Sequence, residues 1–163
     1  MSDPVGVVQR LKDTLPQVGE LVWIGLRPAR QAPVEVVDAT RAEVGAGLVG
    51  DRYGKQGGKR QVTLINAEHL VAIGAFVGEG PVDPARLRRN LVVRGLNLHA
   101  LKGRRFRVGG ALLEHTGPCD PCSRMEAELG AGGFNAMRQH GGITARVLEA
   151  GDLRLGDAVR VEE

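Results

Sequence analysis

Residues 105–116, RFRVGGALLEHT, contain two short apolar runs separated by a turn signal at Gly109 and Gly110. Short runs rich in β-branched residues and bounded by glycine, proline or aspartate are typical of β-strands. The same pattern recurs at residues 20–26, 34–44, 60–65, 90–95, 143–149 and 153–161. The sequence therefore predicts about eight strands.

The predicted helices are fewer and shorter. Residues 66–77 begin with Asn66, which can cap a helix, and place Leu70 and Ile73 on one face. Residues 83–89 begin with aspartate and proline, which suit the cap and the first turn. Eight strands against three or four helices predict a mainly β (α+β) fold, with a closed or strongly curved barrel and a few short peripheral helices.

Length and organisation indicate one domain. The 163 residues are enough to enclose a core without disulfides. Residues 1–19 are expected to form an N-terminal extension with a short helix, capped by Asp3 and with Pro4 in the first helical position. Residues 20–163 are expected to form the domain itself.

Composition narrows the expected partners. The 22 basic residues are interleaved with 19 acidic ones, and aromatic residues make up only 3% of the chain. This pattern favours a local anion pocket over binding to nucleic acid, which uses extended basic surfaces and aromatic stacking. No N-terminal apolar run and no membrane-spanning stretch is visible, so we expect a cytoplasmic protein that does not bind membranes.

Both cysteines lie in HTGPCDPCSRM, residues 115–125. With Asp120 as the cap and Pro121 in the first helical position, Cys122 falls in the first turn of a helix, where a thiolate is favoured with Arg124 nearby. Three alternatives remain at this point. The pair can be a redox dithiol, Cys122 can be a small buried hydrophobe on one helix face with Met125, or the pair can belong to a structural zinc site.

A zinc site would have to recruit His115 or His140, because the chain has a single CxxC pair. The four histidines, which also include His69 and His99, are scattered along the sequence. Each one is explained more simply as a surface or hydrogen-bonded residue.

Two basic segments are candidates for anion binding. GDRYGKQGGKRQ, residues 50–61, carries Arg52, Lys55, Lys59 and Arg60 on a glycine-rich backbone whose N–H groups can face an anion, although a solvated loop is an equal alternative. LRRNLVV, residues 87–93, carries a second basic cluster at the start of a predicted strand. By contrast, GAGLVG, residues 45–50, matches a dinucleotide fingerprint only in its glycine spacing, because no helix can follow it.

The ordered segments 20–54, 57–70, 83–125 and 141–159 together resemble the MOSC domain, named for the C-terminal part of molybdenum cofactor sulfurase, in its stand-alone bacterial form. The resemblance implies a barrel of the pyruvate-kinase type. It also implies that Cys122, which follows a proline, binds the molybdenum of a pyranopterin cofactor or carries sulfur as a persulfide. The implied cofactor-binding residues are Asp51 and Arg52 of GDR, Arg60 and Gln61 of KRQ, and Arg88 and Asn90 of RRN, which departs from the RPN of the amidoxime-reducing branch.

The resemblance implies a small oxidoreductase that binds molybdenum cofactor through Cys122 and reduces small N-hydroxylated compounds. No flavin, haem or iron–sulfur motif is visible, so the electron donor is expected to be a separate protein. The alternative is a sulfur carrier that receives a persulfide from a cysteine desulfurase, with pyridoxal phosphate only on that partner. A third interpretation is a non-catalytic module that binds an anion through Arg52 and Arg60.

Overall fold

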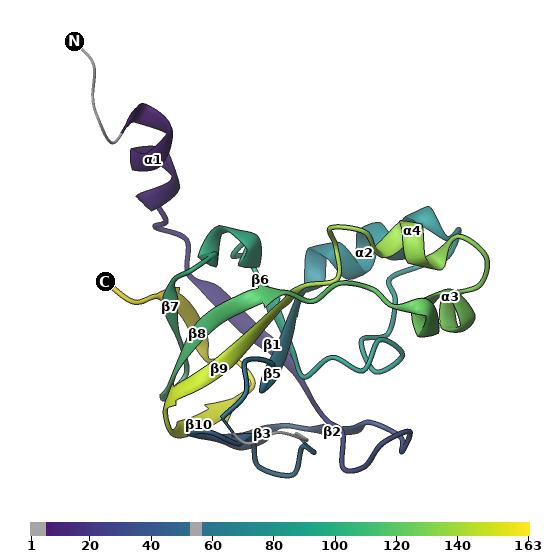
Figure 1. Ribbon diagram of the computed structural model, residues 1–163, viewed down its shortest axis with the longest axis horizontal. Helices are drawn as coiled ribbons and strands as arrows, with labels where there is room; N and C mark the ends of the chain where they lie inside the picture. Colours follow the sequence, from purple (N-terminus) through teal and green to yellow (C-terminus); the bar gives the residue numbers. More distant parts are fainter. Residues whose placement is uncertain (1–5, 53–56) are drawn as a thin grey trace.

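The computed structural model describes residues 6–52 and 57–163 (Figure 1). The strands are β1 (Gly19–Leu26), β2 (Glu35–Val37), β3 (Ala39–Glu43), β4 (Gly47–Leu48), β5 (Val62–Asn66), β6 (Leu91–Arg94), β7 (Arg105–Val108), β8 (Ala111–Pro118), β9 (Ile143–Glu149), β10 (Gly151–Arg154) and β11 (Ala158–Val161). The helices are α1 (Gly6–Asp13), α2 (Ala67–Phe76), α3 (Ser123–Leu129) and α4 (Gly133–Met137), with a 3₁₀ turn η1 (Leu98–Leu101).

The main sheet closes on itself. Its strands follow the order β11-β7-β8-β9-β5-β6-β1, and β1 pairs again with β11 through Gly19 opposite Val159. All of these pairs are antiparallel except β5 and β6, which are parallel and are connected through α2. This closure confirms the predicted mainly β barrel with a few short helices.

Two predicted strands are each divided. Residues 34–44 form β2, which extends the main sheet beside β1, and β3, which pairs with β10 in a separate sheet of the order β10-β3-β4. Residues 153–161 are divided between β10 and β11. A backbone hydrogen bond from Leu155 N–H to the Asp38 carbonyl joins the two break points. The chain therefore changes sheets at Asp38 and at the turn between Arg154 and Ala158.

The helix expected at residues 83–89 is absent, and that prediction was wrong. Residues 84–88 form hydrogen-bonded turns instead, with Leu87 N–H donating to the Pro84 carbonyl. Arg88 has a positive φ of 55°, a left-handed conformation that ends a right-handed turn. The capping prediction for Asp3 and Pro4 lies outside the described residues.

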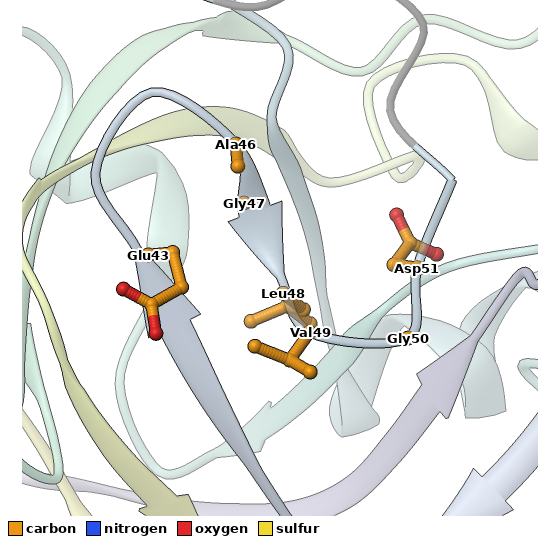
Figure 2. Close-up of a pocket in the computed structure, with 7 residues that line it drawn as sticks. All are labelled: Glu43, Ala46, Gly47, Leu48, Val49, Gly50 and Asp51. Carbon is orange, nitrogen blue, oxygen red and sulfur yellow. The ribbon is translucent and has the colours of Figure 1, made fainter.

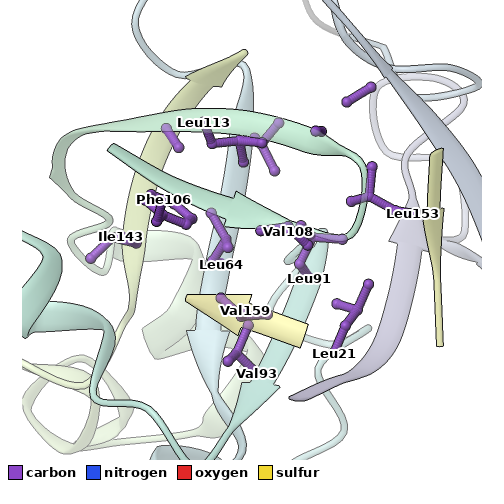
Figure 3. Packing of buried hydrophobic residues seen from close by; sticks show 14 of the residues in the cluster. Leu21, Leu64, Leu91, Val93, Phe106, Val108, Leu113, Ile143, Leu153 and Val159 are labelled. Atoms are coloured by element: carbon purple, nitrogen blue, oxygen red, sulfur yellow. The ribbon is translucent and has the colours of Figure 1, made fainter. Parts of the chain in front are cut away.

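The barrel interior is filled by aliphatic side chains around one ring, Phe106 (Figure 3). Leu64, Leu91, Leu113 and Val159 point into this interior from four strands and are fully buried. A second apolar cluster, which includes Ile65, Ile73, Met125 and Met137, joins the outside of β5 and β6 to α2, α3 and α4. This second cluster holds the three helices, and with them the cysteine segment, against that side of the barrel.

Helix α1 stands away from the barrel (Figure 1) and buries none of its residues. Its C-terminal end is held by an ion pair between Asp13 and Arg104. No helix among the described residues is long and apolar enough to cross a membrane.

Candidate functional site

The cysteine segment connects the end of β8 to α3. Cys122 is the N-cap residue of α3, with extended backbone dihedrals of φ −126° and ψ 175°, and its carbonyl accepts a hydrogen bond from Met125 N–H at 2.9 Å. The expectation that Asp120 caps the helix and Pro121 opens it was therefore wrong, because both residues precede the cap. The shift leaves the Cys122 side chain exposed.

The two thiols differ in exposure. Cys119 is buried, with 4% of its surface exposed, whereas Cys122 is exposed. The buried-hydrophobe alternative therefore describes Cys119, and it is wrong for Cys122, although Met125 on the same helix is buried. Cys122 is the cysteine that a ligand or a partner protein can reach.

A glycine pair holds Cys119 in place. Cys119 N–H donates to the carbonyl of Gly142 at 2.9 Å. A Cβ atom at Gly141 would overlap the Cys119 carbonyl oxygen, and one at Gly142 would overlap the Leu64 carbonyl oxygen. The Gly141–Gly142 turn therefore packs directly against the cysteine segment and tolerates no side chain.

Arg89 lies behind the same turn and is only 7% exposed. Its Nε donates to the Gly141 carbonyl at 2.9 Å and its Nη1 to the Leu87 carbonyl at 2.7 Å, whereas Nη2 is buried without a partner. Burial lowers the pKa of Arg89, and the charges of Cys119 and Cys122 act in the opposite direction. Among the described residues no carboxylate forms a salt bridge with Arg89, so its charge is not neutralised locally.

An arginine pocket of 140 Å³ involves Arg124, which lies two residues beyond Cys122. Its lining consists of Arg27, Ala29, Arg30, Gln31, Arg52, Arg88 and Arg124. Burial and the nearby guanidinium groups of Arg27 and Arg124 lower the pKa of Arg88. Arg88 is fixed by hydrogen bonds from Nη1 to the Ala32 carbonyl at 2.6 Å and from Nη2 to the Ala29 carbonyl at 3.3 Å. Guanidinium groups gathered in this way form a site for an anion such as a phosphate.

A buried polar network supports this pocket. Arg27 donates from Nε and Nη2 to the two carboxylate oxygens of Asp51, at 3.0 and 2.9 Å. Asn90, which is fully buried, donates to Asp51 at 3.1 Å and accepts from Arg27 at 3.1 Å. Asp51 and Asn90 thus hold Arg27 in position from inside the protein.

Gln61 and Arg60, which were also predicted, do not line the arginine pocket. Gln61 is buried and structural, since it accepts from Val147 N–H at 2.9 Å and donates to the Gly58 carbonyl at 2.9 Å. Arg60 is exposed and contributes to the charge around Arg89. Lys55, in the middle of the glycine-rich loop, lies outside the described residues. Of the six residues implied for cofactor binding, Arg52 and Arg88 line the arginine pocket directly.

Two contributors were missed from the sequence. Arg27 and Arg30 follow β1 as apparently ordinary surface residues, and only the folded chain brings them to Arg88 and Arg124. Arg89 belongs to the second basic cluster, residues 87–93, but was not among the residues implied for cofactor binding. Its burial could not be predicted from alternation, because Asn90, Leu91, Val92 and Val93 after it are all buried.

A larger hollow of 460 Å³ lies over residues 43–51 (Figure 2). It is lined by residues 43 and 46–51, among them Glu43, Leu48, Val49 and Asp51. This hollow contains the GAGLVG segment, which forms a turn and the short strand β4 rather than the start of a helix. A hollow lined by acidic and apolar groups is poorly suited to an anion, so the arginine pocket is the better candidate.

The expectation that each histidine is a lone surface or hydrogen-bonded residue was wrong for His69, His99 and His140, which cluster in the fold. The ring of His69 lies 5.8 Å from that of His99 and 5.0 Å from that of His140, measured between centroids. His69 Nδ1, His99 Nε2 and His140 Nδ1 are all buried without a partner. Within residues 6–52 and 57–163, no group of three or more histidine, cysteine or acidic side chains is arranged to hold a metal ion.

Taken together, the fold and the site define a class of protein: a small closed β-barrel that presents an exposed cysteine near an arginine-lined pocket. The chain belongs to the MOSC domain family, whose family model matches residues 45–160. A comparison with curated protein sequences found no match.

Solved structures share the fold. The YuaD protein of Bacillus subtilis is similar with a TM-score of 0.77 and 19% identity, over 91% of this chain and 98% of that one. YiiM of Geobacillus stearothermophilus has a TM-score of 0.70 and 21% identity, over 89% and 75% of the two chains. YiiM of Escherichia coli has a TM-score of 0.68 and 21% identity, over 88% and 70%.

Proposed function

We propose that the protein binds the pyranopterin molybdenum cofactor, with Cys122 as the protein ligand to molybdenum and the arginine pocket as the site of the cofactor's phosphate. The observation that carries this proposal is that Cys122 is exposed and lies two residues before Arg124, and that Arg124 lines the arginine pocket. Membership of the MOSC family supports it, because MOSC domains are associated with this cofactor.

The residues present fit such a group. A thiolate is a soft ligand suited to a heavy transition metal, and Cys122 is free and exposed. Arg52, Arg88 and Arg124 can donate several hydrogen bonds to phosphate oxygens. The buried Nη2 of Arg89, which has no partner, marks uncompensated positive charge near the two cysteines.

When bound, the cofactor would supply two-electron redox chemistry at its metal. The protein's own residues would hold it: Cys122 by ligation, and Arg52 and Arg88 by neutralising the phosphate. Asp51 and Asn90 would act indirectly by keeping Arg27 in place, and Gln61 by fixing the 58–61 loop beside Arg60.

We propose reduction of small N-hydroxylated compounds as the reaction. Removing the hydroxyl oxygen as water consumes two electrons and two protons. The electrons would come from a separate donor protein, and the exposure of Cys122 leaves its side of the barrel open to such a partner. We propose a cytoplasmic setting, because a reducing compartment keeps both cysteines as thiols.

A sulfur carrier is the second candidate, and the exposure of Cys122 also favours it. A persulfide must be reachable first by the donor and then by the acceptor, which the N-cap position allows. The sulfur would come from a partner cysteine desulfurase that itself holds pyridoxal phosphate. Arg89 and Arg124 would stabilise the negative charge of the persulfide.

Expression in paired hosts separates the two candidates. The protein is purified from a host that makes molybdenum cofactor and from one that does not, and its metal, pterin and intact mass are measured. Near-stoichiometric molybdenum and pterin in the first host alone support the enzyme. A protein without metal that carries one extra sulfur on Cys122 supports the carrier, and the absence of both contradicts the two proposals.

A further inference from the structure

The charge balance around Arg89 is unusual for a buried arginine. Buried guanidinium groups are normally paired with a carboxylate, because leaving the charge unpaired in the interior costs free energy. Arg89 is 7% exposed, and the two groups that it contacts, the carbonyls of Gly141 and Leu87, are neutral. The fold therefore retains a positive charge at this point without neutralising it.

The geometry directs this charge toward the cysteine segment. Gly141 joins the two sides: its carbonyl accepts from Arg89 Nε, and a Cβ added to it would lie 3.4 Å from Arg89 Nη2 and would overlap the Cys119 carbonyl. Cys119 N–H is in turn bonded to Gly142. The partnerless Nη2 thus lies close to Gly141, the residue that packs against the Cys119 carbonyl at the start of the cysteine segment.

Two further arginines add to this positive charge. Arg124 follows Cys122 by two residues and lines the arginine pocket with Arg88, and Arg60 acts on Arg89 at longer range. Asp120, which is exposed, is the only carboxylate within the CDPC motif. A cysteine approached through a positive field of this kind favours anionic reaction partners.

We propose that Arg89 is a positioning residue that supplies the fixed positive charge of the cysteine site and makes Cys122 selective for small anionic ligands. These are ligands that carry a carboxylate, an oxyanion or an anionic sulfur next to the atom that meets the thiol. The inference rests on the proposed role of Cys122 as the working thiol, and it does not depend on molybdenum.

The test compares two alkylating reagents of similar size on the protein without metal. Iodoacetate is negatively charged and iodoacetamide is neutral, and both react with the same thiolate, so the ratio of their rates cancels the thiolate fraction. Intact mass follows the first addition, which occurs at the exposed Cys122. A Cys122→Ser variant measures how slowly Cys119 reacts.

In the wild-type protein, the iodoacetate-to-iodoacetamide rate ratio should exceed that of a peptide of residues 115–125 in which Cys119 is replaced by Ser. Arg89→Met should lower the ratio about three- to tenfold, whereas Arg89→Lys should keep most of it. Arg107→Met, which removes an arginine paired with Glu149 and Glu162 on β7, is the matched control and should leave the ratio unchanged.

An unchanged ratio in folded Arg89→Met overturns the proposal. If that variant does not fold, Arg89→Gln takes its place, since it keeps a donor for the Gly141 carbonyl without the charge. A wild-type ratio no higher than that of the peptide overturns the proposal without any variant. The alkylation test uses no metal, so a negative result in it does not contradict the cofactor proposal. In the same way, a protein that binds no molybdenum does not contradict the proposed role of Arg89.

Discussion

Asn90 shows how one side chain can support the site without facing a ligand. Its carboxamide oxygen accepts from Thr63 N–H at 3.0 Å, and its amide group donates to the Gly25 carbonyl at 3.0 Å and to Asp51 at 3.1 Å. It therefore connects β5, β1 and the segment that follows β4. The resemblance implied a ligand role for Asn90, and this geometry makes an indirect role the better proposal.

Replacing Asn90 with Ala should lower the free energy of unfolding by about 3 kcal/mol, because several buried groups, including the Asp51 carboxylate, lose partners. The exposed Asn135→Ala is the matched control and should change stability by less than about 0.5 kcal/mol. Urea unfolding at one pH measures both variants. A loss for Asn90→Ala no larger than that of the control would show that the network contributes little.

At the scale of elements, the turn between α4 and β9 determines how the cysteine segment is held. Gly142 has a φ of 95°, and a Cβ there would overlap the Leu64 carbonyl of β5. Gly156, between β10 and β11, has a similar φ of 92° but nothing near its Cβ position. Comparing substitutions at Gly142 and Gly156 therefore separates the free-energy cost of the left-handed backbone from that of the steric overlap.

Gly142→Ala should lower the free energy of unfolding by more than about 3 kcal/mol, whereas Gly156→Ala should cost about 1–2 kcal/mol, the penalty of the left-handed backbone alone. Thermal and urea unfolding check both values. Faster alkylation of Cys119 should accompany the first substitution, because the Gly142 carbonyl holds Cys119 N–H. Equal losses in the two variants would contradict the close packing of this turn.

The histidine cluster joins α2, η1 and the same turn, and it predicts a pH dependence of stability. Burial first, and then the charges of His140 and His99, lower the pKa of His69 from its ordinary value of 6.5, against a smaller opposing effect of Glu68. The unfolded chain therefore binds a proton more readily at His69 than the folded chain does. The stability that neutral His69 contributes is fully present above pH 6.5, its ordinary pKa. It is lost as the pH falls from there through the lower pKa that His69 has in the folded chain.

The melting temperature of the wild-type protein should accordingly fall as the pH is lowered below about 6.5, and His69→Gln should fall less steeply over the same range. His115, whose pKa is also lowered by burial, remains in the variant and retains part of the slope. Calorimetric melting between about pH 5 and pH 8 measures both slopes. Parallel curves would mean that His69 does not contribute.

At the scale of the whole molecule, local sequence patterns predicted the strands. Pairing between distant segments determined how the barrel closes and where predicted strands are divided. Alternation and β-branched runs were sufficient to place strands at residues 20–26, 105–109 and 143–149, because each repeats within a few residues. Closure of β1 on β11 joins residues about 140 apart in the chain, and no local pattern records it. The division of residues 34–44 has the same cause.

The same distinction applies to the site. Cys122 was predicted as the working thiol from its neighbours Pro121 and Arg124, and the helix there begins two residues later than the capping pattern indicated. The sequence did not identify Arg27, Arg30 or the histidine cluster, because their proximity depends on how distant strands close the barrel. Side chains placed by local geometry were thus predictable, and those brought together from distant parts of the chain were not.

The central claim is that Cys122, and not Cys119, holds the molybdenum of a cofactor in this barrel. The most direct test is the molybdenum content per chain of the wild-type protein, Cys122→Ser and Cys119→Ser, purified from a host that makes the cofactor and measured by elemental analysis. The account predicts bound metal in the wild type and in Cys119→Ser, and a loss of at least about tenfold in Cys122→Ser. Metal retained by Cys122→Ser and lost from Cys119→Ser would contradict it.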